Sequence, residues 1–510
     1  MSTLRSWLNN YGIGRCCAAI LLFLTFGRSP IWGEPPEKGA LFGVRIVDEQ
    51  TGRGVPLATL RTVHDAVYVT DSNGWAAIAE PDLADRHVFF HIESPGYEIP
   101  PDGFGFRGRR IKFARGRNTT VKIRRTSIAQ RLYRVTGQGI YRDTELLGLE
   151  PPMELPQRNA GVMGQDSVQA VPYRGQLFWL WGDTNLANYP LGNFQVTAAT
   201  SPLPKDFAPD SGVPLSYFME PKNPERVRKM MPLAEPGAVW LFGLVNIKGP
   251  DGEPTLVAHY SRQRKLGEVL EHGLARFDDR AGIFRRIKRP PIEETGRFPR
   301  GNAVSVAEDD KQYIYFCQPL AHTRVAAKWE SIIDPAAYEA LAWDAKTQRY
   351  RWQKEAAPTT QRNEQRLIEA GKLPREQARF ALIDAETDSP VTLHRASICR
   401  NDFRKRWIMI GNQEGTRDTP SYLGEVWYAE AESIAGPWSQ AVKIATHPKY
   451  SFYNPRQHPL MATENGRFVF FEGTYTRMFS ASPVATPRYD YNQIMYRLDL
   501  SDERLRPAQD

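Results

Sequence analysis

The run Gly175-QLFWLWGDTN is the first of five similar stretches that decide the fold. Each leads from a Gly-rich or charged turn into aromatic and aliphatic residues and stops at small polar ones. The other four are Gly237-AVWLFGLVNI, Lys311-QYIYFCQPLA, Lys405-RWIMIGNQEG and Gly466-RFVFFEGTYT. Short apolar runs bounded by turns predict strands buried on both faces. One such strand every roughly 60 to 95 residues is the spacing of propeller blades that carry loop insertions. The sequence therefore predicts an all-β fold with a five-bladed β-propeller over residues 159–503.

A second strand-like segment follows four of these runs, at Phe194-QVTAATS, Thr255-LVAHYS, Glu425-VWYAEAES and Gln493-IMYRLDLS. The third unit breaks this rhythm between residues 326 and 385, where polar, helix-like stretches such as Gln361-RNEQRLIEAGKLPREQARF occur. We expect a rim insertion there. It either shapes a cleft or is a solvated decoration, and the sequence favours neither.

The region before the propeller predicts a separate small domain. Residues 40–125 hold short alternating segments, with turn residues at Thr51-Gly52 and Asn73-Gly74 between them. Such alternation with tight-turn chemistry predicts a small β-sandwich. Residues 126–158 then read as a linker.

The N-terminus has the pattern of a secretion signal. Arg5 and Arg15 precede the apolar stretch Cys16-CAAILLFLTF, which is too short to span a bilayer comfortably. We expect residues 1–33 to be a signal peptide and the protein to be secreted or periplasmic, free of the membrane after cleavage. An uncleaved membrane anchor is the alternative.

Composition narrows the choice of partners and cofactors. The 510 residues carry a formal charge of +8, and no Lys/Arg cluster alternates with aromatic residues along one face, so we expect no nucleic-acid partner. Beyond the expected signal only Cys317 and Cys399 remain, and we expect two free thiols rather than a bridge. The ligand spacings of zinc and EF-hand sites are missing, so we predict no metal site and no cofactor. We expect a monomer.

Two resemblances add to this. Residues 43–97 carry G-x-x-x-x-D-x-x-T-G, T-D-S-N-G and S-P-G-Y, and the region resembles the carboxypeptidase regulatory-like, transthyretin-type β-sandwich. The larger part is similar to the five-bladed propeller glycosidases (arabinanases, furanosidases and related enzymes), near uncharacterised bacterial domains. The segments that match are Gly164-QDSVQAVPYRGQLFWLWGDTN, Gly424-EVWYAEAESIAGPW and Tyr453-NPRQHPLMATENGRFVFFEG. The second and third blades lack the acidic residue of that pattern, so its three-carboxylate set is incomplete. A structural calcium ion in the channel is compatible with the resemblance.

Glycoside hydrolysis uses two carboxyl groups whose environments push their pKa values apart. The resemblance implies that Asp166 is the base or nucleophile and that Asp183 is a channel carboxylate that tunes it. Glu425 stands where sister blades carry Gln195 and Gln493, so we expect it to be the general acid. For each of the three, a purely structural role is the alternative.

Other polar residues near the run ends are candidates for substrate binding. Glu414 and Glu472 each end a buried run, and either could replace Glu425 as the acid. In the fifth blade the resemblance implies a channel-lining His458 that binds sugar hydroxyls, with Asn454 and Arg456 beside it. A core histidine is the alternative for His458.

Aromatic residues could stack on sugar faces. Inside the runs, as for Trp179, Trp181 and Phe452, packing in the core is the commoner role. Tyr189 and Tyr453 lie outside the runs and are the better platform candidates.

The sequence thus predicts a secreted glycoside hydrolase that acts on an oligo- or polysaccharide by paired-carboxylate acid/base catalysis. A non-catalytic carbohydrate-binding or surface-assembly propeller is the main alternative, supported by the incomplete acidic set. A polysaccharide lyase would instead need a Tyr/His/Arg constellation.

Overall fold

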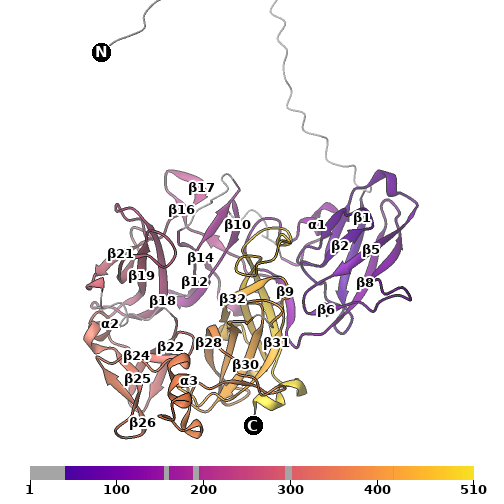
Figure 1. The fold of residues 1–510 in the computed structure, drawn as a ribbon. Coiled ribbons are helices and arrows are strands. Elements are labelled where there is room, and N and C mark those ends of the chain that lie inside the picture. The colour runs from indigo at the N-terminus through magenta and orange to yellow at the C-terminus, as the bar shows by residue number, and fades with distance from the viewer. Residues whose placement is uncertain (1–40, 154–159, 188–194, 293–300, 417–418, 510) are drawn as a thin grey trace, which may run out of the picture. The chain divides into compact units, whose positions relative to one another are not determined.

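The structure is a computed structural model that describes residues 41–153, 160–187, 195–292, 301–416 and 419–509. The expected signal peptide and Tyr189 lie outside the described residues. The part of the chain described is dominated by β-strands, as the sequence predicts (Figure 1).

Five antiparallel sheets of four or five strands follow one another through the described part of residues 169–499, with β9 from earlier in the chain completing the last. In order across the sheet, the first consists of β11 (Gln169–Tyr173), β12 (Gln176–Trp181), β14 (Thr197–Ser201) and β15 (Ser216–Tyr217), and the second of β18 (Ala238–Lys248), β19 (Pro254–Gln263), β20 (Val269–Asp278) and β21 (Ile283–Lys288). The third consists of β22 (Asn302–Glu308), β23 (Lys311–Cys317), β24 (Ala321–Ala326), β25 (Glu339–Asp344) and β26 (Arg349–Lys354), and the fourth of β28 (Leu393–Asn401), β29 (Arg406–Gln413), β30 (Val426–Ala431), β31 (Gln440–Ala445) and the short parallel β27 (Ile383–Asp384). The fifth consists of β32 (Ser451–Gln457), β33 (Phe468–Thr476), β34 (Asn492–Asp499) and β9 (Gln130–Arg134).

The first strands of neighbouring sheets lie against one another. β11 contacts β18, β18 contacts β22, β22 contacts β28, and β28 contacts β32. Side-chain hydrogen bonds then connect β32 to the residues at and just before β11, as in the bond from Arg456 to the carbonyl of Ala170. The five first strands therefore surround a shared space.

Buried apolar side chains fill the layers between neighbouring sheets. Phe178 packs toward the second sheet with Leu241, whereas Trp179 packs toward the fifth sheet with Phe470. Successive residues of a strand point to opposite faces, which is why these runs are apolar without alternation. Each such side chain contributes about 1.5–3 kcal/mol by its burial.

All five aromatic runs form strands, but the second differs from the others. The runs at residues 175, 311, 405 and 466 are the second strands of their sheets, whereas the run at Gly237 is a first strand, β18. Its first residues alternate between buried and half-buried, so the prediction of burial on both faces is wrong there. The half-buried face carries Trp240.

The N-terminal region contains two four-stranded sheets. One is β4 (Trp75–Ile78), β1 (Phe42–Asp48), β8 (Asn118–Arg125) and β6 (Tyr97–Glu98), and the other is β3 (Val67–Val69), β2 (Thr59–Thr62), β5 (His87–Glu93) and β7 (Gly108–Lys112). Their buried side chains form one cluster. Gly74 lies in a turn at φ +79°, where a Cβ would be 2.4 Å from the carbonyl oxygen of Ile46, so the predicted Asn-Gly turn requires its glycine. The transthyretin-type sandwich stays a prediction.

Residues 126–158, expected as a linker, contain regular structure. Strand β9 pairs with β34, and helix α1 (Arg142–Leu146) follows it. Arg131 is 1% exposed and donates to the carbonyls of Pro56 and Pro95 as well as to Tyr496. The N-terminal sheets and the fifth sheet thus meet at this segment.

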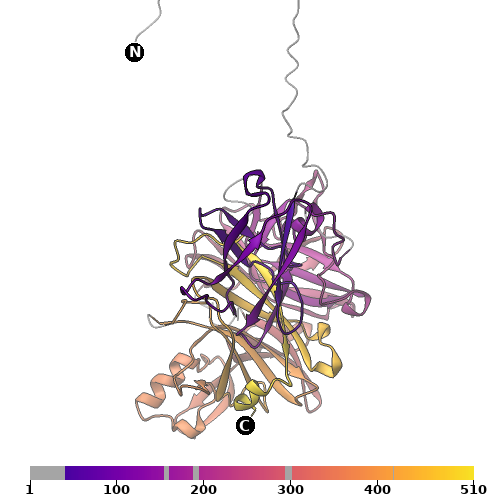
Figure 2. The ribbon, with the colours of Figure 1, turned by 90° about the vertical axis from the view of Figure 1, so that its right-hand side faces the viewer.

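The remaining elements are short. They are the strand pairs β10 (Val162–Gln165) with β13 (Thr184–Leu186) and β16 (Met219–Glu220) with β17 (Asn223–Val227), the helices α2 (Trp329–Ile332) and α3 (Gln361–Glu369), and the 3₁₀ turns η1 (Pro81–Leu83), η2 (Pro204–Asp206), η4 (Pro335–Ala337), η5 (Arg375–Gln377), η6 (Pro459–Met461), η7 (Glu464–Gly466) and η8 (Glu503–Ala508). Of the expected insertion at 326–385, β25 and β26 extend the third sheet, and α3 contacts β26 through the hydrogen bond from Tyr350 to Glu364. Figure 2 shows the ribbon from the side. No helix in the described ranges is long and apolar enough to cross a membrane.

Candidate active site

Asp166 and Asp183 lie side by side because the segments that carry them pair as strands. Asp166 follows β10 and Asp183 precedes β13, and Gln165 lies opposite Thr184 in that ladder. The main-chain N–H of Asp166 donates to the carbonyl of Asp183 at 3.0 Å. The N–H of Asp183 in turn donates to Asp166 Oδ1 at 2.7 Å. The two carboxyl groups predicted from the first run therefore belong to one site.

Gly182 makes room for this pair. A Cβ on residue 182 would lie 2.4 Å from Asp166 Oδ1, closer than any real contact allows. The glycine of the GDT segment is therefore required by the close approach of the Asp166 carboxylate.

Two other sheets supply donors to the pair. The hydroxyl of Tyr453 on β32 donates to Asp166 Oδ2 at 2.9 Å, and Trp240 Nε1 on β18 donates to Asp183 Oδ1 at 2.9 Å. Asp166 is only 9% exposed, whereas Asp183 is half-buried. Asp183 is thus the member of the pair that a substrate can reach.

The surroundings hold a proton on the pair. Burial and, second, the neighbouring charge of Asp183 raise the pKa of Asp166, the bonds from Tyr453 and the Asp183 N–H oppose this, and the net pKa is about 7. Burial also raises the pKa of Asp183, opposed by Trp240. Ionisation of either carboxyl group therefore disfavours ionisation of the other.

A bulge in β32 places Tyr453. The ladder between β32 and β33 shifts register between Tyr453 and Arg456, and Asn454 has φ +52°. Asn454 Nδ2 donates to Ser167 Oγ at 2.6 Å, and Ser167 also has a left-handed φ of +56°. Bulges re-aim side chains, and here Tyr453 is turned toward the acid pair. Asn454 therefore holds the loop after Asp166 instead of facing open solvent.

Aromatic rings lie beside the pair. Tyr453 is 4% exposed and cannot be the open sugar platform expected from the sequence. Phe479 is 47% exposed and packs edge-on against Tyr453, with ring centroids 5.5 Å apart. It has φ +64°, an uncommon conformation for a bulky residue. Tyr491 is buried against Tyr453 and Leu423. Trp179, Trp181 and Phe452 are core residues, as the commoner interpretation holds.

Glu425 is engaged within its own sheet. Its Oε1 accepts from Thr446 Oγ1 at 2.7 Å, and its Oε2 lies 3.3 Å from Lys443 Nζ. The side chain is 1% exposed, and Lys443 belongs to β31, on the far side of β30 from the first strand. A buried, paired carboxylate facing the outer strand does not support the expected role as general acid.

Glu414 is also held in an ion pair. Its carboxylate pairs with Arg362 of α3 and accepts from the Tyr422 hydroxyl at 2.8 Å. The Arg362 guanidinium lowers the pKa of Glu414, which is the wrong direction for an acid that must keep its proton.

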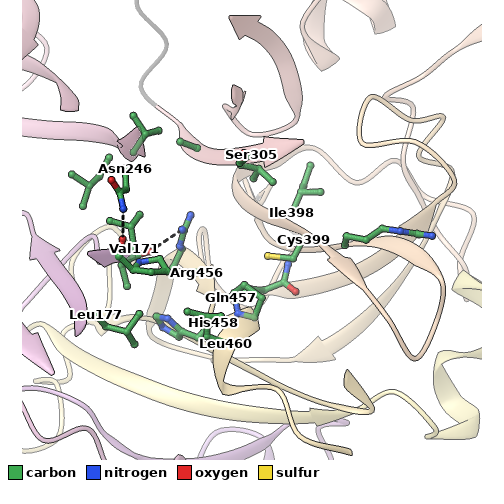
Figure 3. Close-up of a pocket in the computed structure, with 18 of the residues that line it drawn as sticks. Val171, Leu177, Asn246, Ser305, Ile398, Cys399, Arg456, Gln457, His458 and Leu460 are labelled. Atoms are coloured by element: carbon green, nitrogen blue, oxygen red, sulfur yellow. Dashed lines mark hydrogen bonds between the residues drawn. The ribbon is translucent and has the colours of Figure 1, made fainter. Parts of the chain in front are cut away.

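The other predicted residues of the fifth sheet meet at the shared space between the first strands. Glu472 is fully buried, and its Oε1 lies 2.8 Å from His458 Nε2. His458 and Arg456 line a cavity of about 480 Å³ (Figure 3). The lining of this cavity does not include Asp166 or Asp183, so the predicted residues form two groups instead of one.

The sequence analysis missed Trp240, Phe479, Ser167 and Gly182. The run Gly237-AVWLFGLVNI gave no signal for Trp240, because the alternation of burial in β18 shows only in the structure. The positions of Phe479, Ser167 and Gly182 depend on contacts between separate segments of the chain, and residue spacing does not predict such contacts. Among the described residues, no group of three or more His, Cys, Asp or Glu is placed to hold a metal ion. The structural calcium ion stays a prediction, and Cys317 and Cys399 are free.

Comparison with known proteins gives only weak likenesses. No protein-family model and no curated protein matches the chain. Solved structures that match include a putative hydrolase from Bacteroides ovatus (12% identity, 66% of this chain and 86% of the other, TM-score 0.41). A putative exo-β-1,3-galactanase from Bifidobacterium bifidum matches at 12% identity over 73% and 94%, with a TM-score of 0.38. The GH43_1 enzyme from Xanthomonas citri complexed with xylotriose matches at 11% over 66% and 86%, with a TM-score of 0.33. TM-scores this low support no assignment.

Proposed function

We propose that the protein is a secreted glycoside hydrolase built on a five-bladed β-propeller, with Asp183 as its base or nucleophile and Asp166 as the carboxyl group that tunes it. The observation that carries the proposal is the Asp166–Asp183 pair, which accepts hydrogen bonds from donors of three sheets. Glycosidases need carboxyl groups of unequal pKa. An isolated structural aspartate would need neither a second carboxyl group beside it nor a half-buried face.

The geometry favours a reversal of the two roles expected from the sequence. Asp183 meets the substrate as base or nucleophile, because it is the more exposed and engages Trp240 through only one of its oxygens. Asp166 lies beneath it with both oxygens hydrogen-bonded, and it sets the charge of Asp183. Neither Glu414 nor Glu425 is assigned the acid role in this proposal.

Phe479 is proposed as the sugar platform. Its ring is half exposed and rests edge-on against Tyr453, which holds Asp166. A flat aromatic surface beside the acid pair suits the apolar face of a sugar ring.

Several expectations belong to the same proposal. The five sheets are the blades, and β9 closes the ring by pairing with β34. Residues 40–125 form a transthyretin-type sandwich, residues 1–33 are removed on export, and the protein acts as a monomer on an oligo- or polysaccharide.

A carbohydrate-binding propeller without catalysis is the second candidate. It is favoured by the ion pairs of Glu414 and Glu425, which leave no established acid opposite Asp183. The two candidates differ in turnover. We expect the mature protein to release reducing sugar from at least one member of a panel of plant, algal and bacterial polysaccharides, and Asp183→Asn to bind that member without releasing sugar. Binding by both proteins without release by either would favour the second candidate.

A further inference from the structure

The cavity between the five first strands has the form of a ligand site. It encloses about 480 Å³ and is lined by residues of β11, β18, β22, β28 and β32. Most of its wall is apolar, including Val171, Val304, Ile314 and Ile398 (Figure 3). Small-molecule sites are cavities of this size, with apolar walls and a few placed polar groups.

Two arginines, Arg456 and Arg400, line this wall, and Arg456 is the less exposed of them. Its Nη2 donates to the carbonyl of Ala170 at 3.3 Å, a long bond, and its Nε is buried without a hydrogen-bond partner. No carboxylate among the described residues forms an ion pair with it. Burial lowers the pKa of Arg456, and the nearby Cys399, Cys317 and Glu472 oppose this shift only in part. A buried guanidinium normally has such a partner, because an unpaired charge is costly.

One internal acid lies near Arg456 but forms no ion pair with it. Glu472 lies directly opposite Arg456 in the ladder between β32 and β33; its Oε1 pairs with His458, and its Oε2 is buried without a hydrogen-bond partner. The thiols of Cys317 and Cys399 are also near Arg456, and burial raises the pKa of Cys399 to about 11, so this thiol stays neutral at physiological pH. The internal groups therefore leave Arg456 able to accept an external anion.

We propose that this cavity binds a small organic carboxylate, with the carboxylate on Arg456 and an apolar body against Val171, Val304 and Ile398. The planar guanidinium matches a carboxylate in a two-point contact. An inorganic anion would leave the apolar walls without a partner. Because Asp166 and Asp183 do not line the cavity, this binding is separate from the proposed hydrolysis and does not depend on it.

The experiment is a ligand-observed NMR titration of the full chain with benzoate, using benzamide and sulfate as neutral and inorganic comparisons. We expect saturable benzoate binding, with benzamide and sulfate at least about tenfold weaker, as the loss of a charge-assisted contact predicts. Arg456→Gln should weaken benzoate by a similar factor. Arg400→Gln is the matched control, since Arg400 lines the same cavity but is exposed, and should change affinity less than about twofold.

A second variant guards against misfolding of Arg456→Gln. Val304→Trp keeps Arg456 and fills the cavity, so it should also lose benzoate, and thermal melts identify any variant that is unfolded. Asp183→Asn should bind benzoate like the natural protein. Absent benzoate binding, equal binding of benzamide, tighter binding of sulfate, or full binding by a folded Arg456→Gln would each overturn the proposal.

Discussion

Asp166 links protonation to folding at the scale of single residues. Its pKa is raised from 3.8 to about 7, so the folded protein keeps a proton there that the unfolded chain releases. Between these pH values the folded state binds more protons, and the free energy of unfolding falls as the pH rises. The raised pKa of Asp166 therefore lowers the stability of the folded protein at neutral pH.

The first prediction follows from this shift. Asp166→Asn removes the titrating group, so the variant should gain stability relative to the natural protein as the pH rises from about 4 to about 7. The gain has a ceiling of about 4 kcal/mol, at about 1.4 kcal/mol per pKa unit. Urea denaturation at several pH values measures it, with Asp309→Asn in an exposed turn as control. A pH-independent difference between the variant and the natural protein would contradict the shift.

The second prediction concerns Gly182. Gly182→Ala places a methyl group against Asp166 Oδ1, and relieving that clash should cost about 1–3 kcal/mol of stability and displace the pair. Gly103→Ala is the control, because a Cβ there meets nothing within 4 Å. The control should stay within about 0.5 kcal/mol of the natural protein. Chemical denaturation compares the two, and equal effects would show that Gly182 is not tightly packed.

At the scale of elements, β9 is the strand whose pairing could not be predicted from the sequence. Residues 126–158 read as a linker because β9 has only five residues and is preceded by no turn signal. Its pairing with β34 joins segments more than 350 residues apart in the chain, and hydrophobic periodicity carries no information on such partners. Leu132 and Tyr133 of β9 are nevertheless fully buried.

The third prediction tests β9. A chain that begins at Thr136 loses β9 and exposes the edge of β34, which invites pairing with another chain. The lost burial, at about 1.5–3 kcal/mol for each large side chain, is comparable with the whole stability of a typical domain. Size-exclusion chromatography should show aggregates for this chain and a soluble species for one that begins at Leu41. A monomer with an unchanged melting temperature would contradict the assigned role.

At the scale of the whole molecule, the sequence predicted the strands and the two carboxyl groups that the structure brings together. The five runs appear as strands because their apolar patterns are local, and the GQD and GDT segments meet because they lie in one sheet. The contact of Glu425 with Lys443 was not predicted, because it depends on a neighbour in the adjacent strand. Trp240 and Tyr453 reach the pair from other sheets, and only the assembled molecule shows this.

A double-mutant cycle on the rate of sugar release tests whether Asp166 and Asp183 act together in the proposed hydrolysis. Asp166→Asn and Asp183→Asn are compared singly and together, with Glu425→Gln as the matched carboxylate control. Residues that act as one unit are strongly non-additive. We predict that each single variant loses at least about a hundredfold in kcat, that the double variant loses little more, and that Glu425→Gln retains most of the rate. Activity that survives in Asp183→Asn but disappears in Glu425→Gln would contradict the account.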